Sequence, residues 1–236
     1  FWNYTEFFIL SFLILSIADP LASIIGENIN EPKVYRVWID KKSIEGSITF
    51  FTTSFLILYI GSYLLLPYSL SYILCFSFFI ASSATIAELI SARGSDNISI
   101  PVTSILLMIA FDFRFSGTLH LNQIIVSSYF FMLIILIFLL YVFLRFDALS
   151  LSGFFGAVLM GVVLIMLTNL SYLALLAIFF ILCSIISKLI KKKDFISTKG
   201  SKRDVVQVYA NGGIALLICL CDYFQLLLPH WGLLFI

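Results

Sequence analysis

Charged residues are scarce in this 236-residue chain: they make up 11% of it, whereas hydrophobic residues make up 61%. The 14 basic and 13 acidic residues leave a formal net charge of +1, so we expect no nucleic-acid partner. The 4 cysteines lie in apolar segments without the spacing of a metal site. Cys219 and Cys221 are close enough in sequence to share a metal, but small residues buried in a membrane are the better explanation.

The chain also lacks an initiating methionine and a recognisable signal peptide. It begins at Phe1 and stops at Ile236 inside an apolar run. We therefore expect a fragment of a longer protein, cut within the membrane domain at both ends.

What the chain has instead is apolar runs of membrane-spanning length. A helix needs roughly 20 mostly apolar residues to cross a bilayer. Because these runs are continuous rather than alternating, they predict an all-α fold, a polytopic helical bundle integral to the lipid bilayer. About eight spans are expected, at 6–26, 47–66, 69–91, 101–115, 123–144, 148–169, 171–190 and 208–228. The span at 101–115 is short, which indicates a tilted or re-entrant segment.

Lysine and arginine predict the orientation of the chain. The loop at 188–203 is the richest in both, and such loops favour the cytoplasm. If this loop is cytoplasmic, counting back through the spans places Arg145 and the loops at 92–100 and 27–46 on the same side. We therefore expect nearly all the cations and the polar loops on the cytoplasmic face, where nucleotides and Mg²⁺ are found.

Asp19 lies near the end of the first span. A carboxylate at this depth is costly and indicates a functional site, although a helix cap at the interface is the alternative. Pro20 leaves a backbone carbonyl without its helical partner. Ala22 and Gly26, four residues apart, form a small-residue face that permits close approach of a helix or a ligand.

The segment Lys41-Lys42-Ser43-Ile44-Glu45-Gly46-Ser47 opens the second span. The free N–H groups and the positive dipole end of a helix suit a phosphate, and two lysines add charge. Glu45 is a candidate Mg²⁺ ligand, base or positioner of the lysines. The alternative is a helix cap with snorkelling lysines. The candidate cofactor-binding residues here are Lys41, Ser43, Gly46 and Ser47, and the candidate catalytic residues are Lys42 and Glu45.

Glu88 lies late in the third span and is followed by Asp96 and Asn97, near the same face of the membrane. Asp96 and Asn97 can supply oxygen ligands, or they can form a turn. Carboxylates near lysines are what a magnesium–nucleotide site requires. Asp19, Glu88 and Asp96 are therefore candidate metal ligands, Asp19 and Glu88 are also candidate catalytic residues, and Asn97 is a candidate cofactor contact.

A further polar group runs from the basic loop into the last span. Its candidate cofactor-binding residues are Lys202, Arg203, Asn211, Gly212 and Gly213, and Asp204 is a candidate metal ligand. The glycines permit close backbone approach. The alternative is a positively charged stop followed by a pair of packing glycines.

Three of these blocks resemble a known family in order and spacing. They are Ala18-Asp19-Pro20-Leu21-Ala22-Ser23-Ile24-Ile25-Gly26, then Lys41 to Ser47, then Glu88 with Asp96-Asn97 and Pro101. Over residues 1–115 they resemble the CTP-dependent polyprenol kinases, which include phytol kinase and dolichol kinase. Ala18 stands where that family usually has glycine. The resemblance implies that CTP, with Mg²⁺, phosphorylates an isoprenoid alcohol.

From about residue 145 the chain resembles a second family, the DUF92 membrane proteins, which include the plant phytyl-phosphate kinase. Arg145 to Gly153 and Gly200 to Gly213 carry this likeness. The family's later Asp-Thr-x-Ala-Ser-Glu-type segment is not in this chain, so we expect a shortened unit. The likeness implies that the isoprenoid monophosphate is the second unit's substrate. The expected domains are a kinase-like part at 1–115, a connecting span at 116–144 and a DUF92-like part at 145–236.

Two other classes of function stay open. A cytidylyltransferase that makes a CDP-activated lipid, as phosphatidate cytidylyltransferases do, uses similar Mg²⁺ and CTP contacts. A non-catalytic transporter or scaffold needs none of them.

Overall fold

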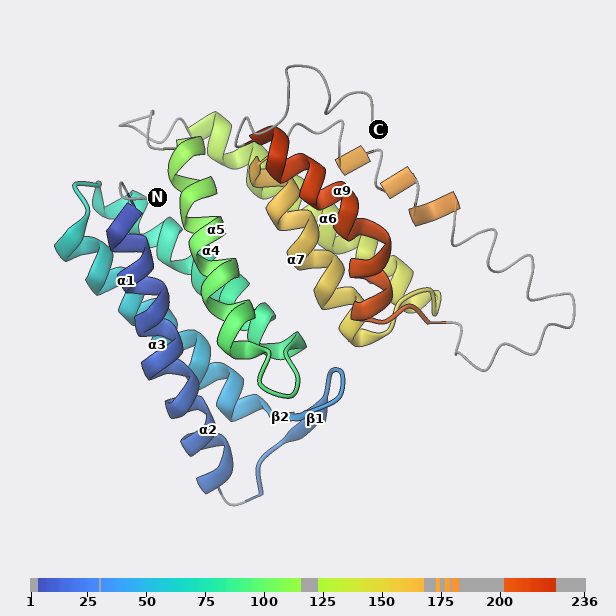
Figure 1. Cartoon of the computed structure of the whole chain (residues 1–236), viewed down its shortest axis with the longest axis horizontal. Coiled ribbons are helices and arrows are strands. Elements are labelled where there is room, and N and C mark those ends of the chain that lie inside the picture. The colour runs from blue at the N-terminus through green and yellow to red at the C-terminus, as the bar shows by residue number, and fades with distance from the viewer. Residues whose placement is uncertain are drawn as a thin grey trace, which may run out of the picture. The chain divides into compact units, whose positions relative to one another are not determined.

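The computed structural model describes residues 4–29, 31–115, 123–167, 173–174, 177–178, 180–182 and 202–223. It is mostly helical, and the chain divides into two compact units, Phe1–Val126 and Ser127–Ile236, each of which is treated by itself (Figure 1). Among the described residues, 4 helices are long and apolar enough to cross a membrane, and shorter apolar helices follow them. The predicted helical fold of an integral membrane protein is confirmed.

The first unit holds the four long helices. The first runs from Thr5 to Asn28 and consists of α1 (Thr5–Leu13), the π-helical turn η2 (Ile14–Ala18) and α2 (Asp19–Asn28). The others are α3 (Ile44–Leu65), α4 (Leu70–Ile90) and α5 (Asp96–Phe115). The short fourth span expected at 101–115 is wrong in length, because α5 begins at Asp96 and has 20 residues, enough to cross the bilayer without re-entry.

The π-helical turn directly precedes Asp19 and Pro20. Proline lacks the N–H that would bond to Ser16, and its ring collides with that carbonyl in a regular α-helix. A wider turn at this position accommodates both effects. Such turns are rare and occur frequently at functional sites.

The polar connection expected at 27–46 contains a β-hairpin. Strands β1 (Val34–Arg36) and β2 (Lys41–Ser43) pair antiparallel, with Tyr35 opposite Lys42. Lys41-Lys42-Ser43 therefore belongs to a strand, and α3 begins only at Ile44. Ser43 is the N-cap of α3, because its hydroxyl accepts a hydrogen bond of 3.1 Å from the backbone N–H of Gly46.

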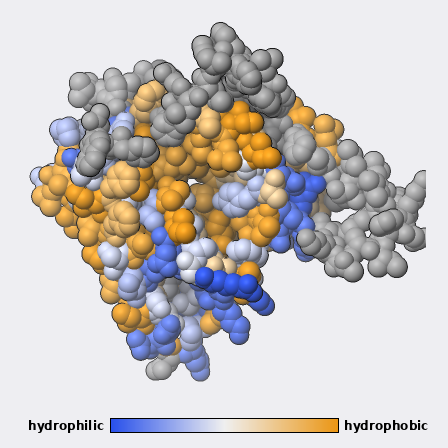
Figure 2. Space-filling model, viewed as in Figure 1, coloured by the Kyte–Doolittle hydropathy of each residue, from blue (hydrophilic) through white to orange (hydrophobic). Residues whose placement is uncertain are grey.

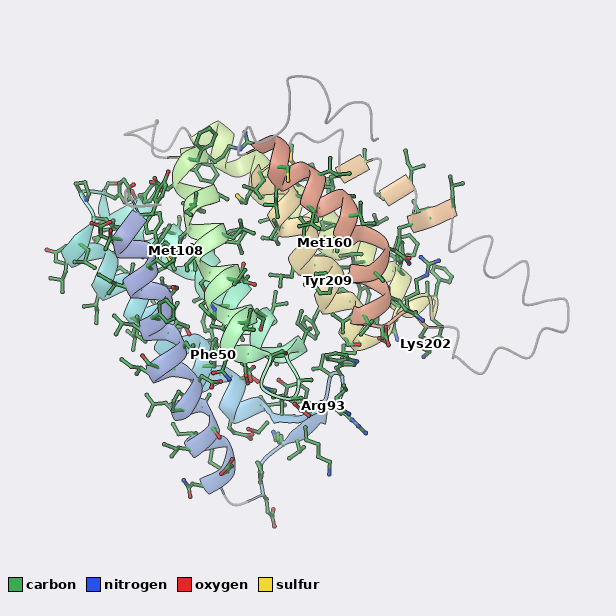
Figure 3. All side chains as sticks on the ribbon, viewed as in Figure 1. Phe50, Arg93, Met108, Met160, Lys202 and Tyr209 are labelled. Atoms are coloured by element: carbon green, nitrogen blue, oxygen red, sulfur yellow. The ribbon has the colours of Figure 1, made fainter. Side chains whose placement is uncertain are left out.

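The core of the first unit lies between its helices. α3 packs against α2 and α4, while α5 packs against α4 and α1. Phe50 and Met108 are fully buried there (Figure 3). At the end that carries the hairpin, α2 and α3 approach each other closely, because a Cβ atom on Gly46 would lie 3.0 Å from the carbonyl oxygen of Ala22. Ala22 and Gly26 thus form the small-residue face that their spacing predicts.

The second unit contains α6 (Gln123–Arg145) for most of its length, α7 (Leu151–Leu167) and α9 (Val205–Tyr223). The span expected at 171–190 lies largely outside the described residues. α7 packs against α9. Where the two helices begin, Arg203 pairs with the chain before α7: its N–H donates to the Ala148 carbonyl at 3.1 Å, and its carbonyl accepts from the Ser150 N–H at 2.9 Å.

Gly153 makes this chain crossing possible, and its replacement should destabilise the second unit. A Cβ atom at residue 153 would lie 2.1 Å from the backbone oxygen of Arg203, so Gly153→Ala forces the main chain to move. We expect a loss of about 1–3 kcal/mol. Gly213→Ala is the matched control, because a Cβ atom there meets nothing within 4 Å. It should be neutral or stabilising by up to about 1 kcal/mol. Thermal unfolding in detergent measures both variants. Equal shifts of their melting temperatures would contradict the close approach of Gly153 to the backbone of Arg203.

Candidate functional site

Polar residues of the first unit surround a pocket of about 380 Å³ at the end that carries the hairpin. Figure 2 shows hydrophilic residues gathered at this end of the unit, below helices that are largely covered by hydrophobic ones. The pocket is formed by α2, the hairpin and the beginnings or ends of α3, α4 and α5. Its lining residues are Asp19, Ala22, Ser23, Gly26, Glu27, Val34, Asp40, Lys41, Lys42, Ser43, Gly46, Ser47, Glu88 and Asp96.

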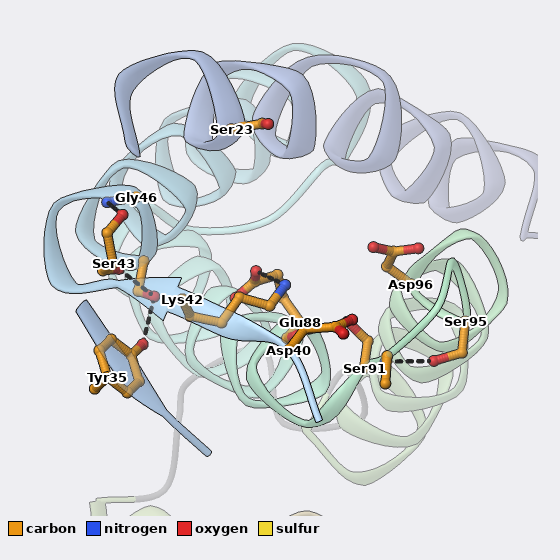
Figure 4. A network of polar contacts seen from close by, with 12 residues as sticks. Ser23, Tyr35, Asp40, Lys42, Ser43, Gly46, Glu88, Ser91, Ser95 and Asp96 are labelled. Carbon is orange, nitrogen blue, oxygen red and sulfur yellow. Dashed lines mark hydrogen bonds and ion pairs between the residues drawn. The ribbon is translucent and has the colours of Figure 1, made fainter. Parts of the chain in front are cut away.

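Lys42 and Glu88 form an ion pair inside this pocket (Figure 4). The Lys42 Nζ atom lies 2.5 Å from Glu88 Oε1, and the side chain of Lys42 is 19% exposed and that of Glu88 8%. The other carboxylate oxygen of Glu88, Oε2, is buried and has no hydrogen-bond partner in the described part of the chain. A buried polar atom without a partner is costly, so this oxygen is available to a ligand.

The hairpin is held against α3 by a pair of hydroxyl groups. The Tyr35 hydroxyl lies 2.6 Å from Ser47 Oγ, and Ser47 Oγ also donates to the Ser43 carbonyl at 3.1 Å. Burial raises the pKa of Tyr35 above its usual value, so this phenol stays protonated at neutral pH. Because Tyr35 lies opposite Lys42 in the hairpin, this contact fixes the strand that carries Lys42.

The carboxylates of the pocket differ in their partners. Asp40 accepts a hydrogen bond from the Arg93 N–H at 3.0 Å, which ties the hairpin to the connection between α4 and α5. Asp96 accepts from the Asn97 N–H at 3.0 Å, and Glu27 accepts from the Ser23 hydroxyl at 3.1 Å. No hydrogen bond or ion pair joins Asp19 to any described residue. Within the described part of the chain, the Asp19 carboxylate and the buried Glu88 Oε2 therefore accept no hydrogen bond.

Of the site residues predicted for the first unit, Glu45 and Asn97 do not line this pocket. Glu45 accepts hydrogen bonds from the backbone N–H of Lys33, with distances of 3.2 and 3.3 Å to its two oxygens. Of the roles predicted for Glu45, positioning fits this geometry, because the bond fixes the chain entering β1. Asp96 and Asn97 begin α5 rather than form a turn, and the Asn97 amide donates to the Gly94 carbonyl at 3.2 Å.

Within the described ranges, no group of three or more His, Cys, Asp or Glu side chains is arranged to hold a metal ion. Mg²⁺ is usually bound by one or two carboxylates together with substrate phosphates and water. The unpaired carboxylate of Asp19 and the free oxygen of Glu88, with Asp96 in the same pocket, fit that requirement.

In the second unit, the structure gives two predicted residues structural partners. Lys202 forms an ion pair of 2.6 Å with Asp147, and both side chains are largely exposed (Figure 3). Asp204 Oδ1 accepts a 2.9 Å hydrogen bond from the Gln207 N–H, so Asp204 caps α9. Among the described residues, Asp204 belongs to no group of three or more His, Cys, Asp or Glu side chains that could hold a metal ion.

Because Asp204 caps α9, Asp204→Ala should lower the stability of the second unit by roughly 0.5–2 kcal/mol. Asp204→Asn should be nearly neutral, because an amide oxygen caps a helix about as well. Melting curves recorded with and without Mg²⁺ measure this. A stabilisation by Mg²⁺ that both variants abolish would instead support the metal-ligand role.

A second pocket, of about 500 Å³, lies within the second unit between α6, α7, α9 and the residues Leu173, Ala174, Ala177 and Phe180. Its lining is apolar except for Arg203 and Asn211, and Gly212 also contributes, whereas Gly213 does not. The Arg203 guanidinium lies over the Phe180 ring, 4.9 Å from its centroid. The sequence gives no signal of this pocket, because apolar residues that line a cavity resemble those that face lipid.

These features define a helical integral membrane protein with a polar pocket in its first unit and an apolar pocket in its second. Residues 134–235 match the model of the family described as integral membrane protein DUF92. The match begins within α6, earlier than the predicted start at residue 145. No curated protein and no solved structure matches the chain. The likeness of residues 1–115 to polyprenol kinases stays a prediction.

Proposed function

We propose that the first unit transfers the γ-phosphoryl group of CTP to a long-chain isoprenoid alcohol of the phytol, geranylgeraniol or dolichol type. The observation that carries this proposal is the pocket that joins two lysines, a helix N-terminus and the unpaired acceptors Asp19 and Glu88 at one end of the bundle. Phosphoryl transfer depends mainly on positioning and on neutralising charge, and these groups do both.

Each residue has a role in this proposal. Lys41 and Lys42 attract the phosphates, and the positive end of the α3 dipole adds to this attraction. Asp19, with Asp96 or Glu88, would hold Mg²⁺, which neutralises the phosphate oxygens when it is bound. The alcohol chain lies among the helices, with its hydroxyl at the membrane surface. We place this end of the unit on the cytoplasmic face, because the basic residues favour it.

We further propose that the second unit acts on the isoprenoid monophosphate. The match of residues 134–235 to DUF92 supports this, because it covers the part of the chain whose resemblance to that family implies an isoprenoid monophosphate as substrate. The apolar pocket next to Arg203 supports it too. One chain would then carry two successive phosphorylations.

Labelled CTP tests the proposal. The chain is reconstituted with geranylgeraniol and Mg²⁺, and given CTP labelled in either the γ- or the α-phosphate. A kinase moves only the γ-label into the lipid fraction. A cytidylyltransferase, with a lipid phosphate as acceptor, moves only the α-label and releases pyrophosphate. If neither label is transferred to geranylgeraniol or to a lipid phosphate, a transporter or scaffold is favoured.

A further inference from the structure

The apolar pocket of the second unit has a definite length and one charged end. On α6 its lining residues run from Phe131 to Phe143. At a rise of 1.5 Å per residue they cover about 18 Å, a little over half the hydrocarbon thickness of a bilayer. Among the lining residues that the structure describes, Arg203 is the only charged one.

The charged end lies beside Phe143 and Phe180. The rings of these two residues are in contact, with centroids 5.1 Å apart, and the Arg203 guanidinium lies over the Phe180 ring. The planar guanidinium group of arginine stacks on aromatic faces and also recognises phosphate. Asn211, on the second turn of α9, is the other polar side chain of the lining.

Part way along the pocket, between Phe143 and Phe131, α6 and α7 pack tightly. Gly161 of α7 lies against Leu136 of α6, because a Cβ atom at residue 161 would lie 2.5 Å from Leu136 Cδ2. Both residues line the pocket. Any larger side chain at residue 161 must displace Leu136 or enter the cavity, so it would shorten the space open to a chain that extends from Phe143 towards Phe131.

We propose that this pocket binds one lipid monophosphate with a single hydrocarbon chain, its phosphate at Arg203 and its chain along α6 towards Phe131. This rests on the proposed function for the identity of the head group, whereas the length and the charge of the site come from the pocket itself. The site selects chains of up to about 18 Å and leaves the far part of a much longer polyprenol chain outside the pocket. Gly161 is a specificity-determining residue for chain length.

Direct binding tests this without any turnover. The full chain in detergent is titrated with radiolabelled geranylgeranyl monophosphate, with geranyl monophosphate as the short ligand, and with dolichyl monophosphate, geranylgeraniol, palmitate and a two-chain phospholipid as competitors. We expect geranylgeranyl monophosphate to bind most tightly. Arg203→Gln should weaken its binding roughly tenfold to a hundredfold and leave that of geranylgeraniol unchanged. Gly161→Leu should weaken geranylgeranyl binding much more than geranyl binding.

Val206→Ala, at an exposed position of α9 outside the pocket lining, is the control and should bind like the wild type. Equal weakening of alcohol and phosphate by Arg203→Gln, or an unchanged chain-length preference in Gly161→Leu, would overturn the proposal. Palmitate or the phospholipid competing as well as the monophosphate would also overturn it. Binding without any kinase activity would contradict the proposed function and leave the binding site standing.

Discussion

Lys42→Met should destabilise the first unit by about 3 kcal/mol, because it leaves the charge of Glu88 buried without its partner. Glu88 is only 6% exposed, and Lys42 is its one ion-pair partner in the described part of the chain. The double replacement Lys42→Met, Glu88→Met removes both charges and should restore most of the lost stability, since apolar residues often substitute well for a buried ion pair. Neither protein should transfer phosphate.

Lys202→Met is the matched control for this prediction. It breaks the ion pair with Asp147, whose side chain is 67% exposed, while that of Lys202 is 53% exposed. Exposed pairs contribute at most about 1 kcal/mol. Thermal unfolding of each variant in the same detergent compares them. If Lys42→Met and Lys202→Met melt alike, the pocket is more hydrated than the structure indicates and Glu88 does not depend on Lys42.

Asp19→Asn should reduce transfer of the γ-phosphate from CTP to the alcohol on the order of a hundredfold to a thousandfold. The side chain keeps its size but loses the charge that would hold Mg²⁺. Stability should change little, because no described residue depends on this carboxylate. The residual activity should need a higher Mg²⁺ concentration, which a titration of the transfer rate measures.

Glu31→Gln is the control for Asp19→Asn. Glu31 is an exposed acidic residue outside the pocket lining, so its loss should leave the rate and the Mg²⁺ requirement unchanged. Asp19→Asn with wild-type activity would remove Asp19 from the proposed site. An equal loss in both variants would point to a general effect of surface charge.

The sequence predicts well that the residues of the polar site lie at the ends of the spans. Asp19, Lys42 and Glu88 each lie at one end of an apolar run, and hydrophobic length alone places those ends on a common side. The small residues Ala22 and Gly26 indicate where two helices approach. These inferences hold because a bilayer leaves a helix few choices of position.

The sequence does not predict the direction in which individual side chains point. In a helix, Lys41 and Glu45 would lie on one face, four residues apart, but a strand turns neighbouring side chains to opposite faces. Lys42 consequently faces Glu88 while Lys41 stays exposed. Glu45, in the first turn of α3, bonds to the Lys33 N–H and lies outside the pocket lining. The hairpin pairing decides these directions, and two strands of three residues give little signal in a loop of mixed composition.

The π-helical turn at Ile14–Ala18 has a consequence for rotation about the helix axis. One residue of an α-helix turns the chain by about 100°. A π-helical turn takes up one residue more than the α-helical turn it replaces. Deleting a single residue from Ile14–Ala18 should therefore let a regular α-helix form with Asp19 still in the pocket. Regularising the turn with all its residues kept would instead rotate Asp19 and α2 relative to α1 by about that angle, so α1 would keep its packing on α5 only if Asp19 left the pocket. The turn therefore sets the angle between the half of the helix that packs in the membrane and the half that carries the carboxylate.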